Sequence, residues 1–201
     1  EKPLVHLTLY NKYKGMCEPI LFKYQDANFV CVTVRPATLC GYAPRQRLDL
    51  SVNILTNHAV NNNKITVFGG SQKRPNLHVQ DMVDVYRALL AAPSEKIAGE
   101  IFNAGFQNMS IMEIAKLAKK VVEEIFPEKG DIEIVTTPTD DIRSYHVNSD
   151  KIRRVLGFEP RFTVEDAIRD LCDAFRSNKL PNSLEDTFYF NVRRLKALKA
   201  A

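Results

Sequence analysis

Residues 29–34 read Phe-Val-Cys-Val-Thr-Val, a continuous run of apolar and β-branched side chains. A run of this kind, in which polar and apolar positions do not alternate, is typical of a strand that is covered on both faces. Strands covered on both faces occur mainly in parallel sheets with helices on either side. The segment therefore predicts an α/β fold, and Arg35-Pro36 directly after it ends the strand.

The segments around this strand alternate between helical and extended patterns. Apolar residues recur at three- and four-residue spacing from Tyr10 to Ala27, which predicts a helix that contains Pro19. Further helices are expected at residues 48–59, 81–91, 110–125, 149–156 and from 163 onward, and further strands at 64–68, 101–104 and 131–135. Alternating strands and helices favour α/β architecture over an all-α fold or a β-sandwich.

Capping residues support three of these helices. Ser110 and Glu113 have the spacing of a capping box, in which each side chain accepts a hydrogen bond from the other residue's backbone N–H. Thr163 has the chemistry of an N-terminal cap, and Gly157 that of a C-terminal cap with left-handed backbone. These positions predict where the helices begin and end.

The composition is that of an ordinary globular protein. The chain has 201 residues, of which 45% are hydrophobic and 26% charged, so it can bury a core in one domain or two small ones. Its stretches of apolar residues are shorter than the roughly 18 that a membrane span requires, so we expect no membrane association. The net charge of +4 is too small and dispersed to favour nucleic-acid binding. The basic cluster at residues 193–199 is better explained as a solvated helix face than as a phosphate site.

The cysteines provide information about compartment and metals. Cys17, Cys31, Cys40 and Cys172 lack C-x-x-C spacing and stand in apolar surroundings. We expect them to be reduced core residues of a cytoplasmic protein, and no metal site is expected.

Tyr10 and Lys14 are the first candidates for chemistry. Residues four apart on a helix lie on the same face, so the phenol and the ammonium can approach one another or a shared ligand. A tyrosine becomes an effective base near neutrality when its pKa falls from about 10 toward 7, and a nearby ammonium favours that change. The spacing alone is common, so an amphipathic helix surface remains an equal alternative.

Several short motifs follow this pair in order along the chain. They are Glu18, the strand end Arg35-Pro36-Ala37, a loop at Gly41, Val67-Phe68-Gly69-Gly70, Arg74 before His78-Val79-Gln80-Asp81, Phe102-Asn103-Ala104-Gly105, Arg143-Ser144-Tyr145, and Asp150-Lys151-Ile152 before Leu156-Gly157-Phe158. The succession resembles the extended short-chain dehydrogenase/reductase family, the NAD-dependent nucleotide-sugar epimerases and dehydratases. The resemblance covers nearly all of the chain, which corresponds to the C-terminal portion of such an enzyme.

The resemblance implies a fold and a division into domains. The fold is the C-terminal part of a Rossmann-like doubly wound parallel sheet, together with a smaller α/β substrate-binding domain. Residues 1–41 would form the end of the Rossmann-like domain with the catalytic helix. Residues 42–201 would form mainly the substrate-binding domain, interleaved with returning Rossmann elements near 76–106.

The family's cofactor is NAD or NADP, but its glycine-rich binding motif is absent from this chain: no G-x-G-x-x-G occurs. That motif and the catalytic Ser or Thr belong upstream of Glu1, so we expect this chain alone to bind the cofactor poorly and to be inactive. An exposed hydrophobic surface is expected where the upstream half would dock. Family members commonly form homodimers through the tyrosine-bearing helix.

The resemblance assigns cofactor and catalytic roles to the N-terminal candidates. Tyr10 would be the catalytic acid/base on a sugar hydroxyl and would also touch the cofactor. Lys14 would hold the cofactor ribose and lower the pKa of the tyrosine. The step Arg35, Pro36, Ala37 lies where the family's chain passes the nicotinamide. Arg35 has an equal structural alternative, in which it satisfies loop carbonyls.

The resemblance also implies a substrate-binding set. Arg74 and Arg143 would bind the diphosphate, because the planar guanidinium fork binds phosphate oxygens in pairs. Asn53 matches a helix-borne contact to the phosphates, although a capping or exposed asparagine is the simpler interpretation. Val67 lies at the strand end that usually holds the nucleobase, and an ordinary core strand is the equal alternative. His78 matches a structural position.

The leading hypothesis is therefore part of an NAD(P)-dependent epimerase/dehydratase that transiently oxidises a hydroxyl of a nucleotide-diphosphate sugar. The alternative is a non-catalytic scaffold or accessory subunit that lacks the cofactor-binding half. Neither the sugar, the nucleobase, nor the choice between epimerase, dehydratase and reductase follows from these residues.

Overall fold

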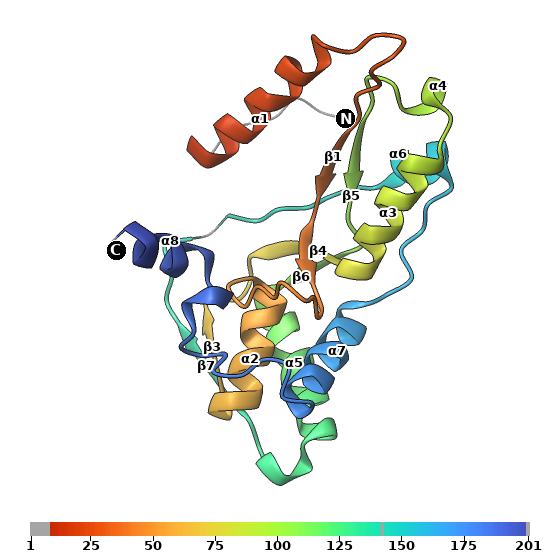
Figure 1. Ribbon diagram of the computed structural model, residues 1–201. Helices are drawn as coiled ribbons and strands as arrows, with labels where there is room; N and C mark the ends of the chain where they lie inside the picture. The colour runs from red at the N-terminus through yellow and green to blue at the C-terminus, as the bar shows by residue number, and fades with distance from the viewer. Residues whose placement is uncertain (1–8, 142, 200–201) are drawn as a thin grey trace.

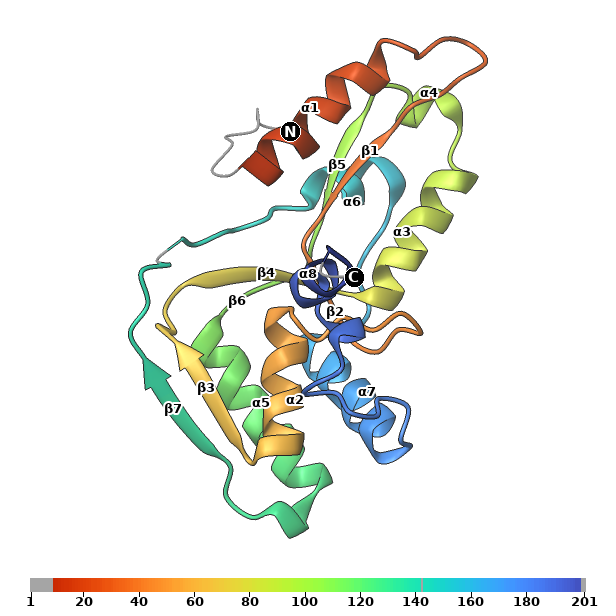
Figure 2. The same cartoon turned by 60° about the vertical axis from the view of Figure 1, so that its left-hand side comes forward.

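The computed structural model describes residues 9–141 and 143–199 and arranges them in two layers that meet at a small central sheet (Figures 1 and 2). The helices are α1 (Leu9–Phe22), α2 (Ser51–Asn62), α3 (Val79–Ala91), α4 (Ser94–Ile97), α5 (Ile111–Ile125), α6 (Asp150–Leu156), α7 (Val164–Arg176) and α8 (Asn191–Lys199), with 3-10 turns η1 (Pro127–Lys129) and η2 (Thr187–Tyr189). The strands are β1 (Thr33–Pro36), β2 (Thr38–Cys40), β3 (Lys64–Phe68), β4 (Lys73–His78), β5 (Ile101–Ala104), β6 (Gln107–Ser110) and β7 (Glu133–Thr137).

The first layer is built on the parallel pair of β1 and β5, in which Thr33 stands opposite Ile101. Helices α3 and α6 pack against one face through an apolar cluster that includes Val85, Phe102 and Ile152. Helix α1 lies along the other side (Figure 1). The parallel pair with helices on both sides confirms the expected α/β class.

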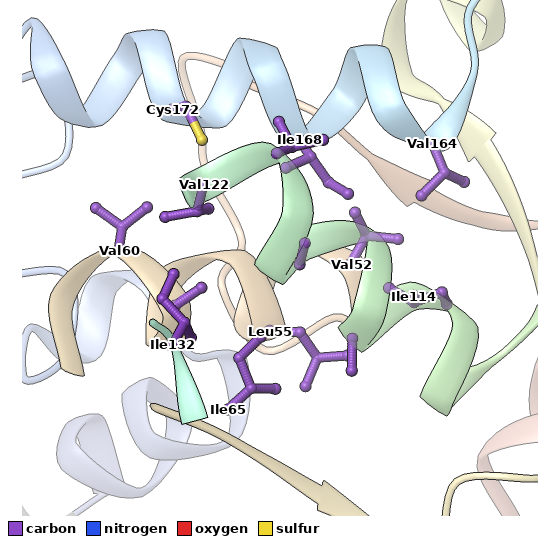
Figure 3. Close-up of a cluster of buried hydrophobic side chains, with 14 of the residues drawn as sticks. Val52, Leu55, Val60, Ile65, Ile114, Val122, Ile132, Val164, Ile168 and Cys172 are labelled. Carbon is purple, nitrogen blue, oxygen red and sulfur yellow. The ribbon is translucent and has the colours of Figure 1, made fainter. Parts of the chain in front are cut away.

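The second layer holds the largest apolar cluster, shown in Figure 3. The parallel strands β3 and β7 form its sheet, α2 and α5 pack against that sheet and against one another, and α7 packs against these two helices. The buried stripe predicted for α5 lies in this cluster, where Ile114, Ala118 and Val122 are fully buried. Burial of these faces stabilises the layer by roughly 25 cal/mol for each Å² of apolar surface removed from water.

The central sheet joins the two layers in the order β2-β4-β6. Strand β4 pairs in parallel with β2 through residues 76–78 and antiparallel with β6 through residues 73–76. None of the three strands has the apolar alternation of a predictable strand, and β4 contains Pro75. From the sequence alone, the segment between Gly70 and the helix expected at 81–91 is interpreted as a basic, proline-containing loop. That interpretation is wrong, because backbone pairing on both sides makes Lys73–His78 a strand.

The capping predictions are confirmed. Ser110 and Glu113 exchange the two hydrogen bonds of a capping box at α5, Thr163 and Asp166 do the same at α7, and Gly157 ends α6 with φ of 65°. Other boundaries shift. The helix expected to reach Ala27 ends at Phe22.

The strand expected at 29–34 is assigned only from Thr33. The reason is its partner: β5 begins at Ile101, opposite Thr33, so most of 29–32 has no ladder to join within the described residues. The helix expected at 48–59 runs from Ser51 to Asn62, and the strand expected at 131–135 is shifted to 133–137 by its register with β3.

One expectation about cysteines is wrong. Cys31, Cys40 and Cys172 are buried, but Cys17 is exposed because none of the residues of α1 is buried. The helix instead presents large apolar side chains to its surroundings, among them Tyr13 and Ile20, which are 62% and 51% exposed. An exposed hydrophobic surface is therefore present. Among the helices of the described segments, none combines the length and apolar character of a membrane crossing.

Candidate functional site

A cavity of about 840 Å³ lies at the junction of the two layers. Its walls come from the start of α1, the segment from the end of β1 through β2 into the following loop, the N-terminal half of α2, strand β4 and the segment between β7 and α6. The lining residues are Tyr10, Asn11, Pro36, Ala37, Thr38, Leu39, Cys40, Gly41, Ala43, Arg45, Gln46, Arg47, Leu50, Asn53, Arg74, Pro75, Val79, Arg143, Tyr145 and Val147. Six of the nine candidates singled out from the sequence are among them.

Tyr10 reaches this cavity from the first turn of α1, and its side chain is largely exposed. Lys14 lies one helical turn further along and is also exposed, but it is absent from the described lining. Because side chains four apart share a helix face, the two remain neighbours on the side of α1 that carries Tyr10. The pair therefore stands at the rim, with the phenol closer to the cavity than the ammonium.

Arg35 does not line the cavity. Its Nε and Nη2 donate to Glu18 Oε1 and Oε2 at 2.9 and 2.6 Å, which is the paired geometry of a guanidinium on a carboxylate. Both side chains are largely buried, at 19% and 14% exposed. This pair joins α1 to β1 through a carboxylate, which is a structural contact of another kind than the loop carbonyls of the alternative.

Asn53 is buried and faces the cavity with its amide already engaged. Its Oδ1 accepts a hydrogen bond from Gly41 N–H at 3.2 Å, and its Nδ2 donates to Arg47 O at 2.8 Å. These bonds hold the loop between β2 and α2. Gly41 has φ of +97°, and a Cβ there would approach His78 Nε2 to 2.8 Å, so this turn of the cavity wall requires glycine.

Arg74 and Arg143 converge, as expected, but on a carboxylate of the chain itself. Arg143 Nε and Nη2 donate to Asp141 Oδ1 and Oδ2 at 2.6 and 2.8 Å. Arg74 Nη2 donates to Asp141 Oδ2 at 3.3 Å, and Arg74 Nη1 donates to the carbonyls of Lys73 and Arg143. The hydrogen bonds from Arg143 lower the pKa of Asp141 to about 2. Arg74 also lies 5.2 Å from the centre of the Tyr145 ring.

Val67 has no exposed surface and belongs to the apolar cluster of the second layer. Its side chain is therefore a core side chain, as the alternative interpretation held, and any contact with a ligand there would involve the backbone or the exposed Phe68. The cavity lining reaches neither residue.

Sequence reasoning assigned no role to four residues that shape this site. Arg45 and Arg47 line the cavity from the loop before α2, Tyr145 packs under Arg74, and Asp141 holds both guanidinium groups. A signal for Asp141 was present, since an acid two residues before an arginine can bond both its backbone N–H and its side chain. The two loop arginines had no such signal.

Comparison with known proteins shows the family to which this chain belongs. Residues 1–105 match the NAD dependent epimerase/dehydratase family, and the chain belongs to that family. The dTDP-glucose 4,6-dehydratase of Neisseria gonorrhoeae is 32% identical over 150 residues, which cover 69% of this chain and 42% of the relative. The chain thus spans less than half the length of that curated relative.

Two solved structures extend the likeness in fold. The dTDP-glucose 4,6-dehydratase of Bacillus anthracis, in complex with NAD, has a TM-score of 0.73 at 20% identity and covers 89% of this chain and 55% of its own. The UDP-glucose 4-epimerase of Thermotoga maritima, with UDP-glucose, has a TM-score of 0.67 at 23% identity and covers 85% and 53%. At these identities the likeness shows the Rossmann-type fold that the sequence predicted.

Proposed function

We propose that this chain is the substrate-binding and catalytic-helix portion of an NAD(P)-dependent epimerase or dehydratase that acts on a nucleotide-diphosphate sugar. The observation that carries the proposal is the cavity itself, because a phenol and two guanidinium groups from distant segments line the same space. The division at residue 41 into a Rossmann-like part and a mainly substrate-binding part belongs to this proposal.

Tyr10 is proposed as the acid/base. Its hydroxyl at the rim would accept the proton of a sugar hydroxyl as the carbon beneath it is oxidised, and would return that proton in a later step. Lys14, one turn away, would favour the phenolate through its charge. Pro36 and Ala37 line the same cavity where β1 ends, which supports a flat ring lying beside that strand end and Tyr10.

Arg74 and Arg143 are proposed to fix the diphosphate at the other end of the cavity. Anchoring a non-reacting part of the substrate orients the sugar carbon and reduces the entropy lost at the reacting centre. Asn53 would act by holding the loop that contains Gly41 and Arg47, since both polar atoms of its amide are engaged in that loop. Val67 would contribute to a nucleobase site through its strand backbone only.

The residues of the cavity wall suit the nicotinamide end of the cofactor, since Tyr10, Pro36 and Ala37 line one space. Tyr10, Lys14, Pro36 and Ala37 would hold the nicotinamide ribose and ring, and Arg35 would support them through Glu18. When bound, NAD(P) supplies a hydride acceptor for the sugar carbon. The glycine-rich pyrophosphate loop is not part of this sequence.

The test is Tyr10→Phe in the protein as it is naturally produced. We expect turnover to be lost, because the phenol that exchanges the proton is removed, while nucleotide-sugar binding measured by calorimetry stays within about twofold. Tyr13→Phe, which removes the same hydroxyl from an exposed tyrosine of α1 that is absent from the cavity lining, is the matched control and should retain turnover. Full turnover of Tyr10→Phe would reject the acid/base role.

A homodimer and a cytoplasmic location are further parts of the proposal. The exposed apolar side chains of α1 support a partner surface on that helix, and a second copy is the occupant we propose. The cysteines of the described segments are free thiols, which supports a reducing compartment. The scaffold alternative is not favoured by the family match.

A further inference from the structure

Asp141 bonds both arginines and lies on the segment that leads from β7 to α6. Its carboxylate accepts three side-chain hydrogen bonds, two from Arg143 and one from Arg74. It also accepts the backbone N–H of Arg143 at 3.3 Å. An acid in the diphosphate site of a substrate-binding cavity needs an explanation, since it removes one of the two positive charges that attract an anion.

The way each guanidinium is held provides that explanation. Asp141 takes the edge of Arg143 formed by Nε and Nη2, so the end formed by Nη1 and Nη2 keeps N–H groups directed away from the carboxylate. Arg74 is fixed by Lys73 O and Arg143 O at Nη1 and by Asp141 at Nη2. A rotamer-rich side chain held in this way loses less entropy when it binds a ligand.

The surroundings make the arrangement rigid. Lys73 N–H donates to Ser144 Oγ at 3.0 Å, and Tyr145 N–H donates to Lys73 O at 3.1 Å. Val147 and Asn108 exchange two hydrogen bonds at 2.9 and 3.1 Å. The segment that carries Arg143 is thus fastened to β4 and β6, and Asp141 extends this order from the backbone to the guanidinium groups.

We propose that Asp141 is a positioning residue for diphosphate recognition: it orients Arg143 and Arg74 so that N–H groups of Arg143 outside the Asp141 pair meet the ligand's phosphates, beside the Tyr145 side chain that also hydrogen-bonds this guanidinium. The inference rests on the proposed function and adds to it the residue that orders the anion site. Asp141 touches no substrate in this arrangement. The alternative role for Asp141 is that of a competitor, which the ligand's phosphates must displace from the two arginines. Removing the Asp141 charge weakens diphosphate binding in the positioning role and strengthens it in the competitor role.

The experiment titrates the protein as it is naturally produced with uridine 5′-diphosphate and thymidine 5′-diphosphate by calorimetry at pH 7. Asp141→Asn is compared with Asp140→Asn, which removes the same charge from an exposed neighbour and so controls for long-range electrostatics. We expect Asp141→Asn to weaken binding about tenfold, equivalent to about 1.4 kcal/mol, and Asp140→Asn to change it by less than twofold. Asp141→Glu, which keeps the carboxylate, should recover part of the affinity.

Two further measurements separate ordering from misfolding and from failure of the proposed function. Binding of uridine, which has no phosphates, should not change in Asp141→Asn, and in the active enzyme the change should appear in KM rather than kcat. Unchanged or tighter diphosphate binding by Asp141→Asn overturns the positioning role while leaving the proposed function intact. If the unaltered chain binds neither diphosphate, the proposed substrate class fails, and the positioning role fails with it.

Discussion

The attachment of α1 gives a prediction whose size can be worked from the structure. Glu18→Gln removes the charge and one acceptor from the pair with Arg35 while keeping nearly the same shape. Exposed ion pairs contribute about 0–1 kcal/mol, and breaking fully buried ones costs about 3–5 kcal/mol. With side chains 19% and 14% exposed and both guanidinium bonds shorter than 3 Å, we expect a loss of about 2 kcal/mol.

That loss should act on α1 rather than on the whole fold. An isolated helix of 14 residues has marginal stability in water. None of the residues of α1 is buried in the described structure, so the order of this helix depends on its few contacts with the rest of the fold, among them the pair of Glu18 with Arg35. A change of 2 kcal/mol corresponds to about a thirtyfold rise in the undocked population. We therefore expect amide hydrogen exchange in α1 to accelerate about thirtyfold in Glu18→Gln, with the urea midpoint of the rest unchanged.

The matched control is Glu133→Gln, which breaks the exposed pair with Lys64 at 3.1 Å. Its side chains are 62% and 48% exposed, so exchange should change by less than about threefold anywhere in the chain. Equal exchange of α1 in the two variants would refute the role of the pair, and so would a general loss of stability in Glu18→Gln. In the active enzyme, Glu18→Gln should lower kcat, because Tyr10 lies on α1.

Two further predictions concern thiols and pH. Burial raises the pKa of Cys40 and Cys172 to about 12, while Cys17 is exposed. A maleimide at pH 8 should therefore modify Cys17 first in the folded chain, as peptide mass spectrometry would show. Labelling of Cys40 at the same rate would contradict this prediction. For Asp141, the pKa falls from 3.8 to about 2 because Arg143 donates to it, so its contribution to the anion site is present above pH 4 and lost as the pH falls through 2. A carboxyl NMR titration with a midpoint near 4 would show that the pair with Arg143 is not formed.

Helices with local signals could be predicted from sequence, and strands defined by distant partners could not. The capping boxes at Ser110 and Thr163 are complete within four residues, so the sequence contains all the information that sets those helix starts. Strand β4 has no such signal. Its residues become a strand because β2 and β6 supply backbone partners from elsewhere in the chain, and Pro75 conceals this in the sequence.

The same division holds for the site. Six of the nine residues that the family resemblance supplied, Tyr10 and Arg74 among them, line the cavity. The resemblance could not determine what each side chain binds in the folded chain. Arg35 is engaged by Glu18 across 17 residues, and Arg143 by an acid two residues away, and both pairings are set by side-chain packing that spacing alone leaves open.

Because the apolar clusters of the two layers are separate, the two layers can unfold at different temperatures. Cooperativity in melting comes from shared burial, and here the layers are joined mainly through the polar sheet of β2, β4 and β6 and the loops around it. The cavity takes its walls from both layers and disappears with whichever melts first. The temperature at which the cavity is lost is therefore the melting temperature of the less stable layer. Substitutions that stabilise only the more stable layer will not raise that temperature.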